Sequence, residues 1–183
     1  MPYRKFIRAA YKHFDVDYPK FFKMDGLSKL GFLSAEVLLA DEKLPDEFPA
    51  EKTGFIIFNA SSSLEIDEKH QSTISNREAY FPSPSNFVYT LPNIMAGEAA
   101  IRHKIKGENT VLISEHFDAG LLHVICEMAF ANDALQCCIG GWVEQYGDDF
   151  ESILFLICRE ENKISVEGVI FEPSTLNNLY KKI

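Results

Sequence analysis

The chain has 183 residues, 46% of them hydrophobic and 13% aromatic, which is enough for one domain with a sizeable core. Its net charge of −9 argues against nucleic-acid binding, because a phosphate backbone requires clustered Lys and Arg. No stretch approaches the roughly 18 apolar residues that span a bilayer, and the N-terminus is basic and aromatic rather than apolar. We therefore expect a single cytoplasmic domain over residues 1–183.

The first half of the chain predicts helices around one buried strand. Residues 25–44 predict an amphipathic helix that ends before Pro45, because its apolar residues recur at three- and four-residue steps: Leu27, Leu30, Leu33, Val37 and Leu38. Residues 53–60 contain a continuous apolar run, typical of a parallel strand covered on both faces. Residues 64–74 predict a polar-faced helix, followed by a loop over residues 81–86 with two prolines.

The next segment predicts a helix, a strand and a second helix. Residues 91–105 have small-residue helical spacing, and Gly107 is the expected C-cap. Residues 110–113 predict a short strand. Asp118 can cap the strongly apolar helix 119–131, which we expect to be nearly fully buried.

The last third predicts three strands. Residues 135–139 form a buried apolar run that Gly140 and Gly141 would close. Residues 152–158 and 164–171 would form a hairpin around a polar turn at residues 159–163. The order of elements predicts an α/β fold with a mixed, mostly parallel sheet and helices on both faces. Residues 3–17 are charged and aromatic and show no strand pattern.

Two groups of reactive side chains have ordinary structural interpretations. One basic cluster could face an acidic partner, but a solvated patch that compensates a helix dipole is favoured: Arg102, His103, Lys104 and Lys106. Four cysteines lie inside apolar runs without CxxC spacing, which favours buried thiols in a reducing compartment over zinc or disulfides: Cys126, Cys137, Cys138 and Cys158. No cofactor or metal site is expected.

Four stretches in order resemble the N-terminal half of the β-ketoacyl-acyl-carrier-protein synthases, of the thiolase-like superfamily. They are residues 22–41 (FKMDGLSKLGFLSAEVLLAD), 52–63 (KTGFIIFNASSS), 91–109 (LPNIMAGEAAIRHKIKGEN) and 133–144 (DALQCCIGGWVE). The third is the most specific, with the family's Pro-Asn, Ala-Gly, Ile-Arg and Gly-x-Asn spacing and no gap, whereas the fourth has one extra residue. The resemblance covers about residues 20–170 and implies the N-terminal half of a five-layered thiolase-like fold.

The resemblance also implies where a nucleophile would lie. In the family, the strand after the Gly-x-Asn turn delivers a cysteine to the N-terminus of a buried helix, where its pKa is lowered. Residues 110–120 here read TVLISEHFDAG, so gapless placement puts His116 at that position and a one-residue shift puts Phe117 there. Neither is a thiol, and the family's two C-terminal histidines have no counterpart. Acyl-enzyme formation by the usual route is not expected.

His116 is the remaining chemical candidate. At a helix N-terminus its neutral form is favoured, and Glu115 and Asp118 are close in sequence, so it could act as a general base. No Ser or Cys is placed beside it, which favours a surface or interface histidine. His123 follows seven residues later, but a metal site would lack a third ligand.

Two functions follow from these observations. The resemblance implies a degenerate, non-catalytic partner, like the chain-length-controlling subunits of two-component ketosynthases, in fatty acid, polyketide or polyene synthesis. The alternative is a small acyl-group-binding protein or acyltransferase-like enzyme with a repurposed site around His116. The implied partners are a second copy or a full-length ketosynthase, and an acyl carrier protein. Residues 110–114 would then be an edge strand, with residues 109–117 near a two-fold axis.

Overall fold

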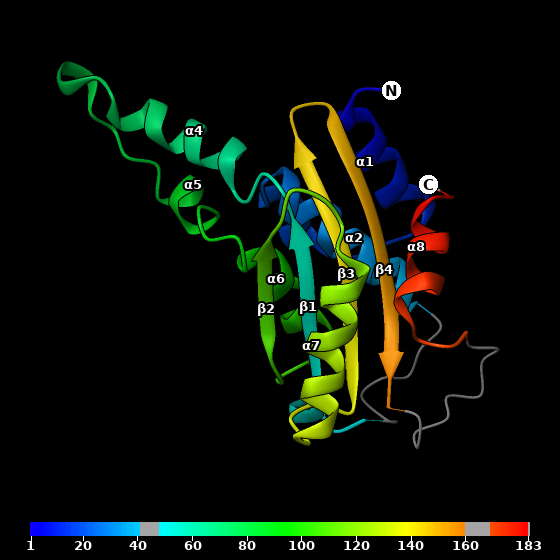
Figure 1. The fold of residues 1–183 in the computed structure, drawn as a ribbon. Coiled ribbons are helices and arrows are strands. Elements are labelled where there is room, and N and C mark those ends of the chain that lie inside the picture. The colour runs from blue at the N-terminus through cyan, green and yellow to red at the C-terminus, as the bar shows by residue number, and fades with distance from the viewer. Residues whose placement is uncertain (41–47, 160–168, 183) are drawn as a thin grey trace.

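The computed structural model describes residues 1–40, 48–159 and 169–182 (Figure 1). Within these ranges no helix is long and apolar enough to cross a membrane. The elements follow the order α1 Tyr3–His13, η1 Pro19–Lys23, α2 Gly26–Leu39, η2 Ala50–Lys52, β1 Thr53–Asn59, α4 Leu64–Ile74, η3 Arg77–Ala79, α5 Pro84–Val88, α6 Ile94–His103, β2 Asn109–Ile113, α7 Ala119–Ala131, β3 Cys137–Tyr146, β4 Asp149–Cys158 and α8 Pro173–Tyr180.

The described strands form one sheet in the order β2-β1-β3-β4. β1 runs parallel to β2 and to β3, so that Phe55 lies opposite Asn109 on one side and Ile139 on the other. β4 returns antiparallel to β3. Every residue of β1 is buried, as its continuous apolar run predicted. The mixed, mostly parallel sheet expected from the sequence is confirmed.

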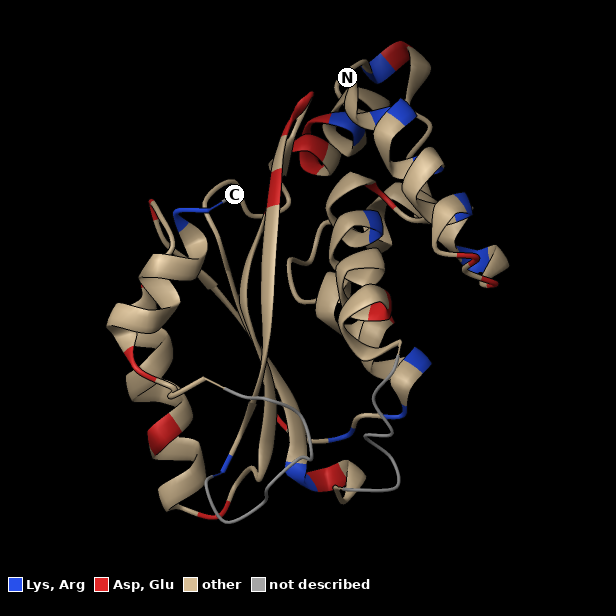
Figure 2. Cartoon of the chain, turned by 90° about the vertical axis from the view of Figure 1, so that its right-hand side faces the viewer, with Lys and Arg blue, Asp and Glu red and all other residues tan. Residues whose placement is uncertain are grey.

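Helices cover both faces of this sheet, which Figure 2 shows edge-on between them. Because successive side chains of a strand point to opposite faces, Phe55 and Ile57 pack in the core under α1, α2 and α6. Ile56 and Phe58 pack in the second core, under α7 and α8. Each fully buried Phe or Ile contributes about 1.5–3 kcal/mol to folding. The central strand is thus anchored by both helical layers.

Two aspartates begin the longest helices, α2 and α7. The Asp25 carboxylate accepts a hydrogen bond from the Ser28 amide at 3.1 Å. The Asp118 carboxylate accepts one from the Leu121 amide at 2.8 Å, which confirms the predicted cap of α7. α2 ends at Leu39. The sequence predicted a helix over residues 25–44, and residues 41–44 of that range lie outside the described residues.

α6 ends earlier than its sequence suggested. Lys104 takes the left-handed C-cap conformation, with φ 58°, and its amide donates to carbonyls of the last turn. Gly107, the predicted C-cap, instead lies against β1, where an added Cβ would come within 2.4 Å of the Thr53 carbonyl oxygen. Its small size is required by this close approach of two backbones, not by helix termination.

α7 is less buried than predicted. Leu122 and Cys126 lie in the core, but Met128 is 59% exposed, and Leu121 and Val124 are also exposed. The helix packs on the sheet and on α8 with one side only, and the apolar residues at positions 121, 124 and 128 form an outward stripe. The expectation of near-complete burial is therefore wrong, and the stripe is apolar surface that nothing in the described residues covers.

The two glycines expected to close a strand lie inside one. β3 continues through Gly140 and Gly141 to Tyr146, and the turn at residues 147–148 leads into β4. β4 therefore forms its hairpin with the preceding strand. The predicted second strand of a later hairpin, residues 164–171, lies outside the described residues except for 169–171, which are not in a strand.

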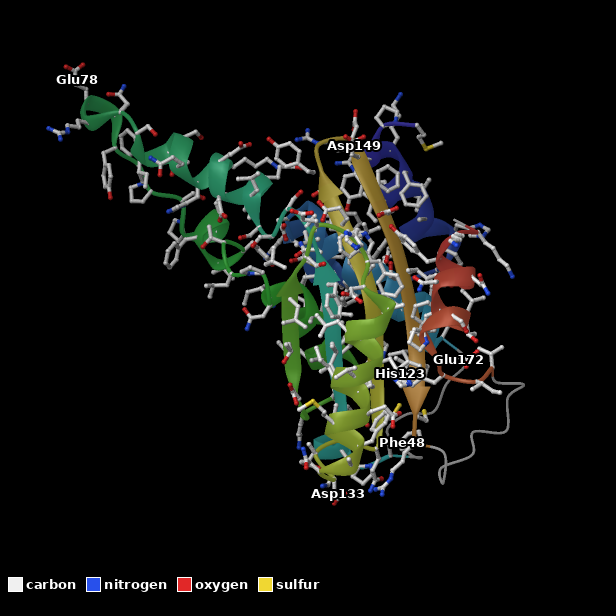
Figure 3. The ribbon with its side chains drawn as sticks, viewed as in Figure 1. Phe48, Glu78, His123, Asp133, Asp149 and Glu172 are labelled. Carbon is white, nitrogen blue, oxygen red and sulfur yellow. The ribbon has the colours of Figure 1, made fainter. Side chains whose placement is uncertain are left out.

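Residues 64–88 form an arm that projects from the body of the molecule (Figure 1). It consists of α4, η3 and α5, with Glu78 at its far tip (Figure 3). Part of the loop predicted over residues 81–86 is helical, because Ser83 caps α5 through the Asn86 amide at 3.2 Å and Pro84 occupies its first turn. Several aromatic and aliphatic side chains of this region are exposed: Tyr80, Phe81, Phe87 and Val88.

An ion cluster joins α2 to α6. The Glu36 carboxylate accepts hydrogen bonds from Arg102 at 3.1 and 3.2 Å and lies 2.8 Å from His103 Nε2. Burial would raise the pKa of Glu36, but its close contacts with His103 and Arg102 outweigh this effect, so the pKa is lowered. Two members of the predicted basic patch thus pair within the molecule.

Glu36→Gln is expected to lower the free energy of unfolding at pH 7 by about 1 kcal/mol, because it breaks this cluster. Since the folded-state pKa of Glu36 is depressed, its contribution is present above the unfolded value of about 4.3 and is lost as pH falls through the folded value. Urea unfolding should show a larger difference at pH 7 than at pH 3. Glu127→Gln, at an exposed position of α7, is the matched control; equal losses in both variants would contradict this account.

Candidate functional site at the ends of the parallel strands

The carboxyl ends of the parallel strands β1, β2 and β3 lie at the same end of the sheet, which is where parallel sheets usually bind their ligands. The chain leaves β2 through Ser114, whose amide donates to the Asn59 carbonyl at 2.9 Å. Four residues later α7 begins at its Asp118 cap. The short junction between β2 and α7 contains His116 and Phe117, the two residues that the resemblance put at the nucleophile position.

The two candidates for that position have opposite environments. His116 is exposed, whereas Phe117 is buried at 4% exposure. The Phe117 ring packs against Tyr180 at 5.1 Å and Phe155 at 6.2 Å between ring centroids. Phe117 thus anchors the junction in the core under α7 and α8, whereas the imidazole of His116 lies at the surface.

The junction does not assemble a nucleophile with a base. The Ser114 hydroxyl donates to the backbone carbonyl of His116 at 2.7 Å, not to the imidazole. Across residues 1–40, 48–159 and 169–182, no Ser or Thr hydroxyl hydrogen-bonds a histidine ring. Activation of a hydroxyl would require such a contact or a water between the two groups.

The four thiols lie away from this junction. Cys126 is in the middle of α7, Cys137 and Cys138 are at the start of β3, and Cys158 is at the end of β4. Burial raises the pKa of the Cys138 thiol well above its usual value, and the neighbouring Cys126 adds to the effect. Three of the four are buried as predicted, and Cys158 is half-buried.

Glu144 on β3 holds the turn that follows β1. Its carboxylate accepts hydrogen bonds from the amides of Ala60 at 2.6 Å and Ser61 at 3.1 Å. In the sequence, Glu144 stood out only as the last residue of the fourth stretch of the resemblance, residues 133–144. Its role could be anticipated because small residues after a buried strand leave amides that need an acceptor.

His123, the second histidine considered as a ligand, lies on α7 and stacks on Phe171 at 4.9 Å between ring centroids. Its side chain is half-buried. In the described parts of the chain, no three or more His, Cys, Asp or Glu side chains form a group that could hold a metal ion.

His116→Ala is expected to change the free energy of unfolding by less than about 0.5 kcal/mol, because the side chain is exposed and no hydrogen bond of its ring is found among the described residues. Urea unfolding measures this directly. Phe117→Ala, one residue further, should cost about 3–5 kcal/mol through loss of a buried aromatic. A large loss at His116 would instead mark it as a structural residue.

No family model and no curated protein matches the sequence. Among solved structures, the ishigamide ketosynthase/chain length factor is 22% identical with a TM-score of 0.58, covering 69% of this chain and 36% of that chain. A ketosynthase in complex with its chain length factor from Xenorhabdus doucetiae is 13% identical with a TM-score of 0.55, covering 71% and 51%.

A third solved structure is a type II polyketide synthase acyl-carrier protein in complex with its ketosynthase, bound to the hexaketide. It is 16% identical with a TM-score of 0.53, and the match covers 76% of this chain and 40% of that chain. The chain spans about a third to a half of the length of these structures. At these identities the likeness concerns the fold alone, an α/β fold similar to that of these ketosynthase structures.

Proposed function

We propose that the chain is a non-catalytic, ketosynthase-like subunit that pairs with a full-length ketosynthase in polyketide or polyene synthesis. The observation that carries the proposal is the combination of this fold with a β2–α7 junction that presents histidine and phenylalanine instead of a thiol. The similar structures include complexes of a ketosynthase with a chain length factor, and that pairing is the model for the role proposed here.

The edge of β2 supports pairing with another chain. Glu108 and Ser114 bond to β1, and because bonding alternates along a strand, the amides of Val111 and Ile113 face away from the sheet. Ile113 is 55% exposed. An unpaired edge with apolar side chains is a template for a second strand and an aggregation hazard when left uncovered.

The arm supports the same assignment. It projects on the side of the molecule where β2 forms the edge (Figure 1), and it presents Phe81 at 78% exposure and Phe87 at 64%. Exposed aromatic side chains of this density are typical of protein interfaces rather than free surfaces. The α7 stripe at positions 121, 124 and 128 adds apolar surface that a larger assembly would cover.

A second candidate function is a small acyl-group-binding protein or acyltransferase-like enzyme that uses His116. The observation in its favour is the exposed imidazole at the carboxyl edge of the sheet, next to Ser114. The hydrogen bond of the Ser114 hydroxyl to a backbone carbonyl argues against this function.

The subunit of the first proposal could also pair with a second copy of itself instead of with a ketosynthase.

The proposal is tested by incubating the purified chain with an acyl carrier protein that carries an acyl thioester. Intact mass measurement should show no acyl adduct on this chain, while a cysteine-containing ketosynthase in the same buffer is labelled. An adduct that disappears in His116→Ala would favour the second candidate. An adduct on any of the four cysteines would overturn the non-catalytic role.

A further inference from the structure

A second region of the molecule has the features of a small-molecule site. A cavity of about 780 Å³ lies where α1, η1, the start of α2 and α4 meet, beside the turn between β3 and β4. Its volume is within the range of sites that hold a drug-sized ligand. Four of its lining residues come from α1: Tyr3, Arg4, Ile7 and Arg8.

Cationic side chains gather around this cavity although the chain as a whole carries a net charge of −9. Arg4 and Arg8 come from successive turns of α1, a helix without a single acidic residue (Figure 2). Lys23 comes from η1, Lys29 from α2 and Lys69 from α4. Five cations from four separate elements thus face one space.

The carboxylates that also line the cavity are engaged by the protein itself. Asp25 caps α2, and Asp148 accepts a hydrogen bond from the Tyr3 amide at 2.9 Å. Glu65 accepts from Lys69, from the Gln145 side chain and from the Gly147 amide. The three carboxylates keep their negative charges, so five cations stand against three anions in the lining of the cavity, and one of these pairs, Lys69 with Glu65, is already formed.

The remaining cations are not held in salt bridges: within the described residues, no ion pair involves Arg4, Arg8, Lys23 or Lys29. Lys29 donates to the Met24 carbonyl, and its pKa is lowered, chiefly by burial; the nearby Asp25 opposes this shift, and the positive charges of Lys69, Arg8 and Arg4 add to it. Like charges held together in this way gain from a bound anion.

We propose that this cavity binds a small organic phosphate, with the phosphate group between Arg4, Arg8 and Lys29. Guanidinium groups match phosphate oxygens with paired hydrogen bonds, and lysines add positive charge. The organic part would rest on Phe22, which lines the cavity and is exposed beside Lys23. This site is independent of the subunit role proposed above and lies on elements other than the β2–α7 junction.

The test is isothermal titration calorimetry at low ionic strength with inorganic pyrophosphate, inorganic phosphate and phenyl phosphate. Pyrophosphate should bind with 1:1 stoichiometry and a Kd below about 1 mM, and phenyl phosphate should bind more tightly than inorganic phosphate. Arg8→Gln should weaken binding about tenfold, because one charge-assisted hydrogen-bonding group is lost. Arg4→Gln, a second surface variant, should act in the same direction.

Lys12→Gln is the matched control, since Lys12 is exposed on the same helix and carries the same charge but does not line the cavity. It should change affinity less than about twofold. Equal losses for Arg8→Gln and Lys12→Gln, or no binding at millimolar pyrophosphate, would overturn the site. Phenyl phosphate binding no better than inorganic phosphate would overturn the organic part of the assignment.

Discussion

Ile113→Lys is expected to weaken pairing with a full-length ketosynthase by at least about a hundredfold. The side chain lies on the unpaired edge of the sheet and is 55% exposed, so the variant should fold. In a paired sheet the lysine would be buried against the partner strand, and unpaired charge at an interface costs several kcal/mol, where each 1.4 kcal/mol is tenfold in affinity. Sedimentation velocity of the mixed proteins measures the loss.

Val37→Lys provides the control for Ile113→Lys. Val37 is also an exposed aliphatic residue, but it lies on α2, which packs over β3 and β4 at the other side of the sheet. It should leave the affinity for the ketosynthase unchanged. If both lysine variants pair as well as the parent chain does, association does not use the edge of β2.

Gly141→Ala is expected to lower the free energy of unfolding by about 3 kcal/mol or more. Its φ of 153° is a conformation that side-chain-bearing residues rarely adopt, and an added Cβ would lie 2.1 Å from the Ile153 carbonyl oxygen. Because that oxygen belongs to the backbone of β4, the clash cannot be relieved by moving a side chain. Urea unfolding monitored by circular dichroism measures the effect.

Gly97→Ala is the matched comparison for Gly141→Ala. Gly97 lies in α6, and a Cβ there would meet nothing within 4 Å. Alanine has the higher helix propensity, so this variant should gain about 0.5–1 kcal/mol. Similar losses at both glycines would mean that the close approach of β3 and β4 does not limit the residue at position 141.

The elements predicted correctly from sequence are those in which local pattern and tertiary role agree. β1 follows from a run of apolar residues that only a doubly covered strand can bury, and α7 begins at an aspartate with the right spacing to cap it. The four-part resemblance further predicted the ketosynthase-like fold. In these elements the local preference of the residues and their place in the fold favour the same structure.

The errors arise where tertiary contacts decide. Gly141 looks like a strand end, yet it is required inside a strand because the neighbouring backbone approaches too closely for any side chain. Gly107 follows a predicted helix and so looks like its C-cap, yet it is required because the backbone of β1 approaches it closely. The apolar composition of α7 predicts burial on all sides, but only the sides that face other elements are covered. An apolar residue such as Met128 does not indicate whether another element packs against it.

The sequence predicted that His116 and Phe117 lie between a strand and a helix, and the structure has them between β2 and α7. Their opposite exposures were not predicted, because they depend on Tyr180 and Phe155, which lie far along the chain. The first helix of the arm, residues 64–74, was predicted, but α5 was not, because the aromatic residues around it lie among prolines and serines, a composition typical of loops. The cations of the α1 cavity are likewise scattered in sequence and meet only in the fold.

The most direct test of the proposed role is mass spectrometry of one mixture: this chain, a full-length ketosynthase and an acyl carrier protein bearing an acyl thioester. Native spectra should show this chain in a one-to-one complex with the ketosynthase, and denatured spectra should show the acyl group on the ketosynthase alone. A free chain of 20.8 kDa beside an unpaired ketosynthase, or an acyl adduct on this chain, would contradict the role proposed here.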